Sequence, residues 1–247
     1  MRKYAEAENI QLVFSGSNYF DTLERIIDES RYILHLQTYI FNTDETGFRV
    51  MDALKRAARR NVRVFLMVDA YASFPFPKDL ADDLRQAGVH FRLYSPLLTS
   101  ESMFIGRRMH HKVVVADKRT GMLGGINIAN KYNSGVTDKT WLDFAVLITG
   151  DVCEYLHLLC EQFYKKQNPR ALNAWEKNFS HALSKINTHK YVRFRRNDWL
   201  KRKNEIHKSY LEAIIRSESS ITLVASYFLP GNNIRRLLRE AAARGVE

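Results

Sequence analysis

The stretch RRMHHKVVVADKRTGMLGGINIAN, residues 107–130, combines a short strand, a polar turn and a second short strand. His110 and Lys112 stand one residue apart where the first strand begins. Successive side chains of a strand point to opposite faces, so we expect His110 and Lys112 on one face and His111 on the other. This pairing makes His110, rather than its neighbour, the candidate functional histidine. Asp117 follows the strand in the turn.

The second strand leads into Gly124-Gly125-Ile126-Asn127. Two glycines let the backbone approach a ligand closely. The Asn127 amide adds a neutral hydrogen-bond donor at the same place. An imidazole, a lysine and an amide at these spacings indicate a site rather than an ordinary turn.

Outward from this stretch, apolar alternation predicts strands and 3.6-residue periodicity predicts helices. The strands are expected at 10–14, 32–41, 62–68, 90–94, 112–116 and 144–148, and the helices at 18–30, 46–60, 78–86 and 151–167. Strands that alternate with helices are typical of an α/β layer structure. Cys153 and Cys160 lie seven residues apart on one face of the last helix, which favours a buried pair over a metal site or a disulfide.

An internal repeat indicates how the chain is organised. Residues 23–41, LERIIDESRYILHLQTYIF, align without a gap onto 211–229, LEAIIRSESSITLVASYFL, and 53–62 align onto 237–246. The second copy stops at Glu247, the equivalent of Arg63. We therefore expect an internal duplication with a truncated second copy. The predicted parts are a first lobe over 1–167 with its signature at about 104–131, a basic connector over 168–204, and the beginning of a second lobe over 205–247.

The charge of the chain favours a polyanionic partner, either nucleic acid or an anionic lipid surface. Thirty-eight Lys and Arg residues stand against 27 acidic ones, and the net charge is +11. The N-terminal residues MRKYAEAENI lack the apolar stretch of a signal peptide. No apolar run approaches the roughly 18–20 residues that span a bilayer. If this chain works on membranes, we expect it to work from the surface.

The spacing His110-x-Lys112-x4-Asp117, followed by Gly124-Gly125-x-Asn127, is similar to the signature of the phospholipase D superfamily. The strings GGINIANKY and SYFLPGNNIRRLLREAAARGV resemble bacterial cardiolipin synthases in particular. The resemblance implies a phospholipase D-like lobe, in which helices flank a central mixed β-sheet. It also implies catalysis without a metal or another cofactor, because cationic side chains replace the metal.

The resemblance assigns roles to the residues of the signature. His110 is the nucleophile toward phosphorus, or alternatively the general acid for the leaving alkoxide. Lys112, Asn127 and Gly125 hold the phosphate oxygens. Asp117 completes the catalytic set, where it is expected to fix the turn and pair with Lys112. Asp143 stands where the family commonly has an acidic residue that orients the histidine.

The resulting prediction is a phosphatidyltransferase that makes cardiolipin from phosphatidylglycerol, an anionic phospholipid. The chain is expected to sit peripherally on the cytoplasmic face of the membrane and to contact it through Phe104, Ile105, Arg107 and Arg108. A second His-x-Lys motif would come from a missing C-terminal half. The alternatives are phospholipid hydrolysis, a nuclease using the basic residues 190–203, and a non-catalytic membrane scaffold. Nucleic acid is disfavoured, because that basic segment matches no recognisable binding module.

Overall fold

The computed structural model describes residues 4–94, 98–99, 102–103, 108–165, 190–197 and 204–247, which fall into two compact units. The larger unit ends at Val192 and the smaller one begins at Arg193. This boundary lies inside the predicted connector over 168–204. Most of that connector, and the residues Phe104, Ile105 and Arg107, lie outside the described residues.

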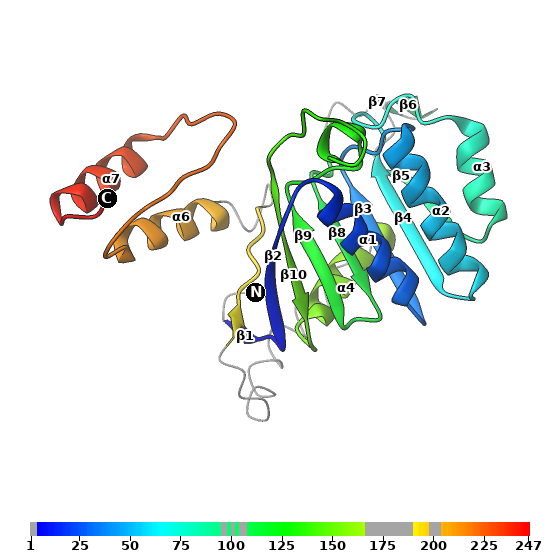
Figure 1. The fold of residues 1–247 in the computed structure, drawn as a ribbon, viewed down its shortest axis with the longest axis horizontal. Helices are drawn as coiled ribbons and strands as arrows, with labels where there is room; N and C mark the ends of the chain where they lie inside the picture. The colour runs from blue at the N-terminus through cyan, green and yellow to red at the C-terminus, as the bar shows by residue number, and fades with distance from the viewer. Residues whose placement is uncertain (1–3, 95–97, 100–101, 104–107, 166–189, 198–203) are drawn as a thin grey trace. The chain divides into compact units, whose positions relative to one another are not determined.

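The larger unit is built on a seven-stranded sheet in the order β2-β10-β9-β8-β3-β4-β5 (Figure 1). Its strands are β2 (Asn9–Phe14), β3 (Ile33–Thr38), β4 (Arg63–Asp69), β5 (His90–Tyr94), β8 (Lys112–Ala116), β9 (Thr120–Gly124) and β10 (Phe144–Thr149). β3, β4 and β5 run parallel, whereas the other neighbours pair antiparallel. Two-residue strands form two further pairs, β1 (Ala5–Glu6) with β11 (Tyr191–Val192) and β6 (Leu98–Thr99) with β7 (Ser102–Met103). The predicted mixed sheet is confirmed.

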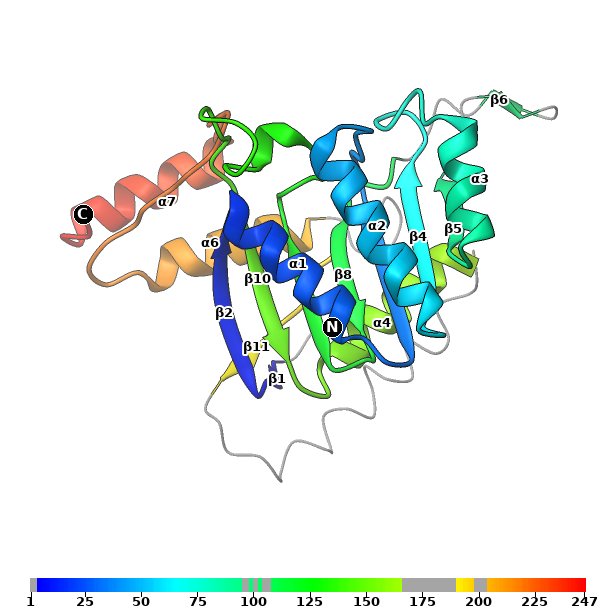
Figure 2. The same cartoon turned by 45° about the vertical axis from the view of Figure 1, so that its right-hand side comes forward.

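Helices cover both faces of this sheet (Figures 1 and 2). α1 (Ser17–Glu29) and α2 (Glu45–Arg59) lie on one face, α4 (Cys153–Lys165) lies on the other, and α3 (Lys78–Gln86) packs beside β5. Leu34 and Leu36 of β3 join the apolar core under α1 and α2. Gln37 alternates to the other face, where its side chain donates to the Cys160 carbonyl of α4 at 2.7 Å. Both cysteines are buried and free, as predicted.

The strand directions bring one set of strand ends to a single edge of the sheet, the upper edge in Figure 1. The C-terminal ends of β2, β3, β4, β5 and β9 meet there with the N-terminal ends of β8 and β10. Thr38 of β3, for example, lies opposite both Val68 of β4 and Lys112 of β8. This site edge therefore collects side chains from seven separate segments of the chain.

The smaller unit contains α6 (Glu205–Arg216) and α7 (Asn232–Ala243), which pack around Ile214 and Leu237. Its contacts repeat those of the larger unit. The Arg60 side chain donates to the Ile27 carbonyl at 2.9 Å, and the Arg244 side chain donates to the Ile214 carbonyl at 3.3 Å. These matched helix-end contacts support the duplication. The Arg63 amide donates to the Tyr32 carbonyl at 3.1 Å, and the Glu247 amide likewise donates to the Ser219 carbonyl at 2.9 Å, so the match continues into the next segment.

The counterpart of β3 in the smaller unit, residues 221–229, does not form a strand. The Ile221 amide donates to the Glu247 carbonyl at 2.7 Å, which corresponds to the start of the β3–β4 pairing. A strand requires hydrogen-bonded neighbours, and the described residues of 193–247 provide this segment with no second strand. Its apolar side chains are consequently exposed: Leu223, Val224, Tyr227, Phe228 and Leu229.

Candidate active site

His110 and Lys112 lie together at the site edge, where β8 begins. The Lys112 ammonium is 3.2 Å from Nδ1 and 3.4 Å from Nε2 of the His110 imidazole. His111 lies on the opposite face, where its Nδ1 is 3.3 Å from Oε1 of Gln37 and its ring packs against Phe163. The alternation predicted from the sequence is therefore present, and it leaves His110 beside the lysine with an exposed imidazole.

The surroundings of the pair keep the histidine neutral and the lysine charged at neutral pH. Partial burial lowers the pKa of His110, the neighbouring Lys112 charge lowers it further, and Asp69 opposes both. Burial lowers the pKa of Lys112 to about 8, and the Asp143 carboxylate acts in the opposite direction. The ring of Tyr39 lies 4.6 Å from the His110 ring and 5.1 Å from the Lys112 ammonium. A neutral imidazole beside a cation is suited to attack a phosphodiester.

The glycine turn lies against the Asp143 carboxylate. A methyl group added to Gly125 would collide with the Asp143 Oδ1 atom, so this position admits only glycine without a shift of the aspartate. Asp143 itself accepts a hydrogen bond from the Phe144 amide at 2.7 Å. Its charge acts on Lys112, whereas the carboxylate acting on His110 is Asp69. Asp143 is not hydrogen-bonded to His110 among the described residues, and its orienting role toward the histidine stays a prediction.

Asn127 is buried at the same edge, and both the oxygen and the nitrogen of its side-chain amide make hydrogen bonds. Its Oδ1 atom accepts from the Ile40 amide at 3.1 Å, and its Nδ2 atom donates to the Tyr132 hydroxyl at 3.0 Å. These bonds fix the orientation of the side chain. An NH2 group carries two N–H bonds, so the bond to Tyr132 uses one donor and leaves one for a phosphate oxygen.

Asp69, which the sequence reasoning missed, is fully buried where β4 ends. Its carboxylate accepts from the Tyr71 and Ala72 amides at 3.0 and 3.2 Å and from the Met109 amide at 2.9 Å. The last bond fixes the residue just before His110. An aspartate at the end of the apolar run VRVFLMVD was the available signal, because carboxyl ends of parallel strands gather at one edge.

Asp117 lies at the opposite end of β8, roughly 16 Å from Lys112 for five residues of strand. Its carboxylate accepts three backbone N–H bonds, from Arg31 at 2.8 Å, Tyr32 at 2.8 Å and Ile33 at 2.9 Å. The predicted pairing of Asp117 with Lys112 is therefore wrong, and its place in the catalytic set stays a prediction. Asp117 instead joins the turn after β8 to the start of β3.

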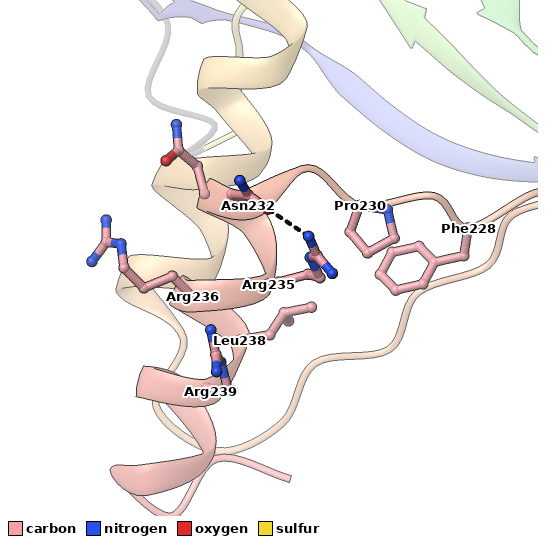
Figure 3. A pocket seen from close by; sticks show the side chains of 8 residues that line it. Phe228, Pro230, Asn232, Arg235, Arg236, Leu238 and Arg239 are labelled. Carbon is pink, nitrogen blue, oxygen red and sulfur yellow. Dashed lines mark hydrogen bonds between the residues drawn. The ribbon is translucent and has the colours of Figure 1, made fainter.

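Two further features bear on the identity of the site. Within the described ranges, no three His, Cys, Asp or Glu side chains gather as metal ligands would. A pocket of about 780 Å³ lies in the smaller unit, between Phe228, Pro230 and the arginines of α7 (Figure 3). None of its lining residues belongs to the signature, so the site is assigned to the edge that holds His110.

Of the four predicted membrane contacts, Arg108 lies among the described residues. Its guanidinium nitrogen is 4.0 Å from a carboxylate oxygen of Asp69.

Relatives of known name share most of this chain. It is 28% identical over 248 residues to cardiolipin synthase B of Escherichia coli, covering 98% of this chain and 59% of that protein. It is 26% identical to the probable cardiolipin synthase YwiE of Bacillus subtilis, covering 97% of this chain and 48% of that protein. The chain thus spans 59% of the length of one of these relatives and 48% of the other.

Solved structures share the fold. The phosphatidylserine synthase of Haemophilus influenzae aligns with a TM-score of 0.67 at 15% identity, covering 99% of this chain and 62% of that one. Nuc, a phospholipase D family member from Salmonella typhimurium, aligns with a TM-score of 0.50 at 18% identity, covering 65% of this chain and 96% of that one.

The family model for the phospholipase D-like domain of cardiolipin synthase matches residues 23–149, just over half of the chain. The matched region runs from α1 to the end of β10 and contains His110, Lys112, Asn127 and Asp143. The chain therefore belongs to the cardiolipin synthase family of phospholipase D-like domains.

Proposed function

We propose that the protein transfers a phosphatidyl group from one phosphatidylglycerol to another and so makes cardiolipin. The observation that carries this proposal is the His110–Lys112 pair, with 3.2 Å between the ammonium and the imidazole Nδ1 atom. The Lys112 ammonium donates to a ring nitrogen, and this requires an unprotonated acceptor nitrogen. The lowered pKa of His110 favours the same neutral form, which suits a nucleophile better than a general acid.

The reaction proceeds in two displacements at phosphorus. In the first, a nitrogen of His110 forms a bond to phosphorus, the P–O bond to the glycerol headgroup breaks, and the glycerol oxygen takes a proton. In the second, a hydroxyl oxygen of another phosphatidylglycerol forms a bond to phosphorus and the P–N bond to His110 breaks, which releases cardiolipin. The hydroxyl proton returns to the group that protonated the glycerol oxygen in the first step. Lys112 and one N–H of Asn127 hold the phosphate oxygens through both steps, whereas the Gly125 amide already donates to the Phe144 carbonyl at 2.9 Å.

The first step needs an acid for the glycerol oxygen, and we assign this acid to a second His-x-Lys motif outside residues 1–247. The described residues near His110 offer Lys112 as a cation, but Lys112 is needed on the phosphate. A soluble diester with a weakly basic leaving group, such as p-nitrophenolate, does not need the acid. The 247-residue chain should therefore release p-nitrophenol in a burst equal to the enzyme concentration, while it makes little cardiolipin from phosphatidylglycerol.

Mass spectrometry of the protein quenched during the burst should find the phosphoryl group on His110. A burst without phosphohistidine would reject the nucleophile, and full cardiolipin synthesis by residues 1–247 alone would reject the need for a second motif. Adding glycerol as an acceptor that competes with the solvent water separates transfer from hydrolysis, because the two acceptors give different products from one intermediate.

A nuclease is less well supported. Its candidate binding segment includes Arg193 and Arg195, and both arginines pair with Glu212 of α6.

We propose that the chain acts as a peripheral protein on the cytoplasmic face of an anionic membrane. In the part of the chain that the structure describes, no helix is both long and apolar enough to cross a bilayer.

A further inference from the structure

Exposed apolar side chains flank His110 on both sides of the site edge. On one side, Trp141 and Leu142 are 57% and 65% exposed, and the Lys131 ammonium lies 4.1 Å from the centre of the indole ring. On the other side, Tyr71 and Phe74 are 57% and 74% exposed. The Arg108 guanidinium lies 4.8 Å from the centre of the Tyr71 ring. Each side therefore combines exposed apolar groups with a cation above an aromatic ring.

Both groups belong to the same edge of one sheet. Trp141 and Leu142 lie just before Phe144, where β10 begins, and Tyr71 and Phe74 follow Asp69, where β4 ends. Four interstrand spacings separate β10 from β4, which is about 19 Å. His110 precedes β8, the middle strand of these five. The apolar groups thus stand on either side of the catalytic histidine.

The backbone holds the Trp141 side in place. The Trp141 amide donates to the Lys131 carbonyl at 2.8 Å, and the Trp141 carbonyl accepts from the Ser15 hydroxyl at 2.7 Å. The ring of Tyr132 contacts the indole edge at a centroid distance of 5.9 Å. An anchored backbone that presents a tryptophan and a leucine outward is suited to insertion into a surface.

We propose that Tyr71, Phe74, Trp141 and Leu142, here named the rim, contact the interfacial region of an anionic phospholipid bilayer and bring His110 to the lipid headgroups. Tryptophan and tyrosine favour the headgroup level, and leucine and phenylalanine favour the acyl boundary. Lys131 and Arg108 match the negative phosphates. The inference rests on the proposed function, since it names the surface from which that site would take its substrate.

Nucleic acid fits the rim less well than a bilayer does. Bases bind by stacking on aromatic faces, whereas cations already lie above the faces of Trp141 and Tyr71. The exposed Leu142 offers nothing to a phosphate backbone. An aliphatic side chain next to a tryptophan is what a bilayer interface accommodates.

Tryptophan fluorescence tests the rim directly. The other two tryptophans, Trp175 and Trp199, are replaced by phenylalanine, so that Trp141 is the only reporter. Vesicles of phosphatidylglycerol and phosphatidylcholine with brominated acyl chains should shift its emission to the blue and quench it. The matched control removes Trp141 as well and carries Tyr32→Trp, because Tyr32 is 71% exposed at the opposite edge of the sheet. The indole introduced by Tyr32→Trp should not be quenched.

A second measurement separates the rim from the reaction. The double variant Trp141→Ser, Leu142→Ser should keep the p-nitrophenol burst with a soluble diester. When the same diester is presented as a lipid in vesicles, we expect the double variant to release p-nitrophenol at least about tenfold more slowly than the unaltered chain, because the apolar contact with the bilayer is lost.

Three results would each overturn the proposed membrane contact of the rim. They are unchanged Trp141 emission with vesicles, equal quenching in the Tyr32→Trp control, and an unchanged rate on vesicles in the double variant. Quenching of Trp141 by single-stranded oligonucleotides in place of vesicles would overturn it in favour of nucleic acid. Loss of the soluble-diester burst in the unaltered chain would reject the proposed function alone, because the quenching does not depend on catalysis.

Discussion

At the scale of single residues, the two adjacent histidines should behave in opposite ways. His110→Ala removes the imidazole beside Lys112 and should abolish the p-nitrophenol burst. His111→Ala removes a ring that packs on Phe163 of α4 and should leave most of the burst, with some loss of stability. Rapid-quench measurements on both variants check this ranking. A burst that survives in His110→Ala and disappears in His111→Ala would reverse the assignment.

Asp69 should set the protonation of His110 as well as the position of Met109. A negative charge favours the imidazolium form, so Asp69→Asn should lower the His110 pKa further and move the acid limb of the rate profile to lower pH. NMR titration of the imidazole measures this shift without any reaction. Asp117→Asn is the matched control, because it makes the same change at the far end of β8. An equal shift in both variants would show that Asp69 has no specific effect.

Asp117 should matter for stability and not for chemistry. Asp117→Ala removes the acceptor of the Arg31, Tyr32 and Ile33 amides. The first two bonds are exposed and can be replaced by water, so we expect a loss of about 0.5–1.5 kcal/mol, the net value of one hydrogen bond. We expect a lower urea midpoint by circular dichroism, with a normal burst per folded molecule. A stable but inactive Asp117→Ala protein would restore the catalytic role.

At the scale of elements, the contact between β3 and α4 makes the larger unit sensitive to acid. His35 and His157 meet there with ring centres 5.0 Å apart, and neither nitrogen of His35 has a hydrogen-bond partner among the described residues. Burial, followed by His157 and the charges of Lys165 and Arg63, lowers the His35 pKa to about 3.

Because the unfolded histidine titrates near 6.5, the unfolded state binds more protons between pH 6.5 and 3, and stability falls as the pH falls through this window. The loss from His35 between pH 6.5 and 5 is about 2 kcal/mol. His35→Phe, which retains the stacking on Phe65, should shrink the difference between urea unfolding at pH 7 and at pH 5. His90→Phe is the control, since His90 stacks on the same ring while remaining exposed. An undiminished difference in His35→Phe would place the acid sensitivity elsewhere.

The elements themselves were largely predictable, because every strand of the large sheet has one or two faces of apolar residues. The predicted helix 78–86 matches α3, and the strands 90–94 and 112–116 match β5 and β8. Contacts between distant segments were not predictable. The carboxylates of Asp69 and Asp117 bind amides 40 and 84–86 residues away, and no local pattern records such partners. The same limit applies to 221–229, whose strand-like sequence lacks the neighbours that β3 has.

At the scale of the whole molecule, the exposed segment 221–229 should make the 247-residue chain self-associate. An extended segment with unpaired backbone groups and apolar side chains is a template for pairing with another chain. Val224→Lys with Leu229→Lys should reduce the association that sedimentation velocity detects as a concentration-dependent shift. Tyr32→Lys, a comparable change at an exposed residue of the larger unit, should not. Equal association in all three proteins would locate the contact on another surface.

The position of Asp117 changes what the signature spacing means. The four residues between Lys112 and Asp117 are Val113–Ala116, the remaining residues of β8. Lys112 lies in the site at one end of this strand. At the other end, the Asp117 carboxylate accepts hydrogen bonds from three backbone amides. The fixed interval between Lys112 and Asp117 therefore corresponds to the length of β8, which runs from one edge of the sheet to the other. An insertion or deletion of one residue between the two would turn Lys112 to the wrong face or pull Asp117 off its seat. A pattern that looks like a list of reactive groups thus also records the length of a strand, and Asp117 marks the end of that strand.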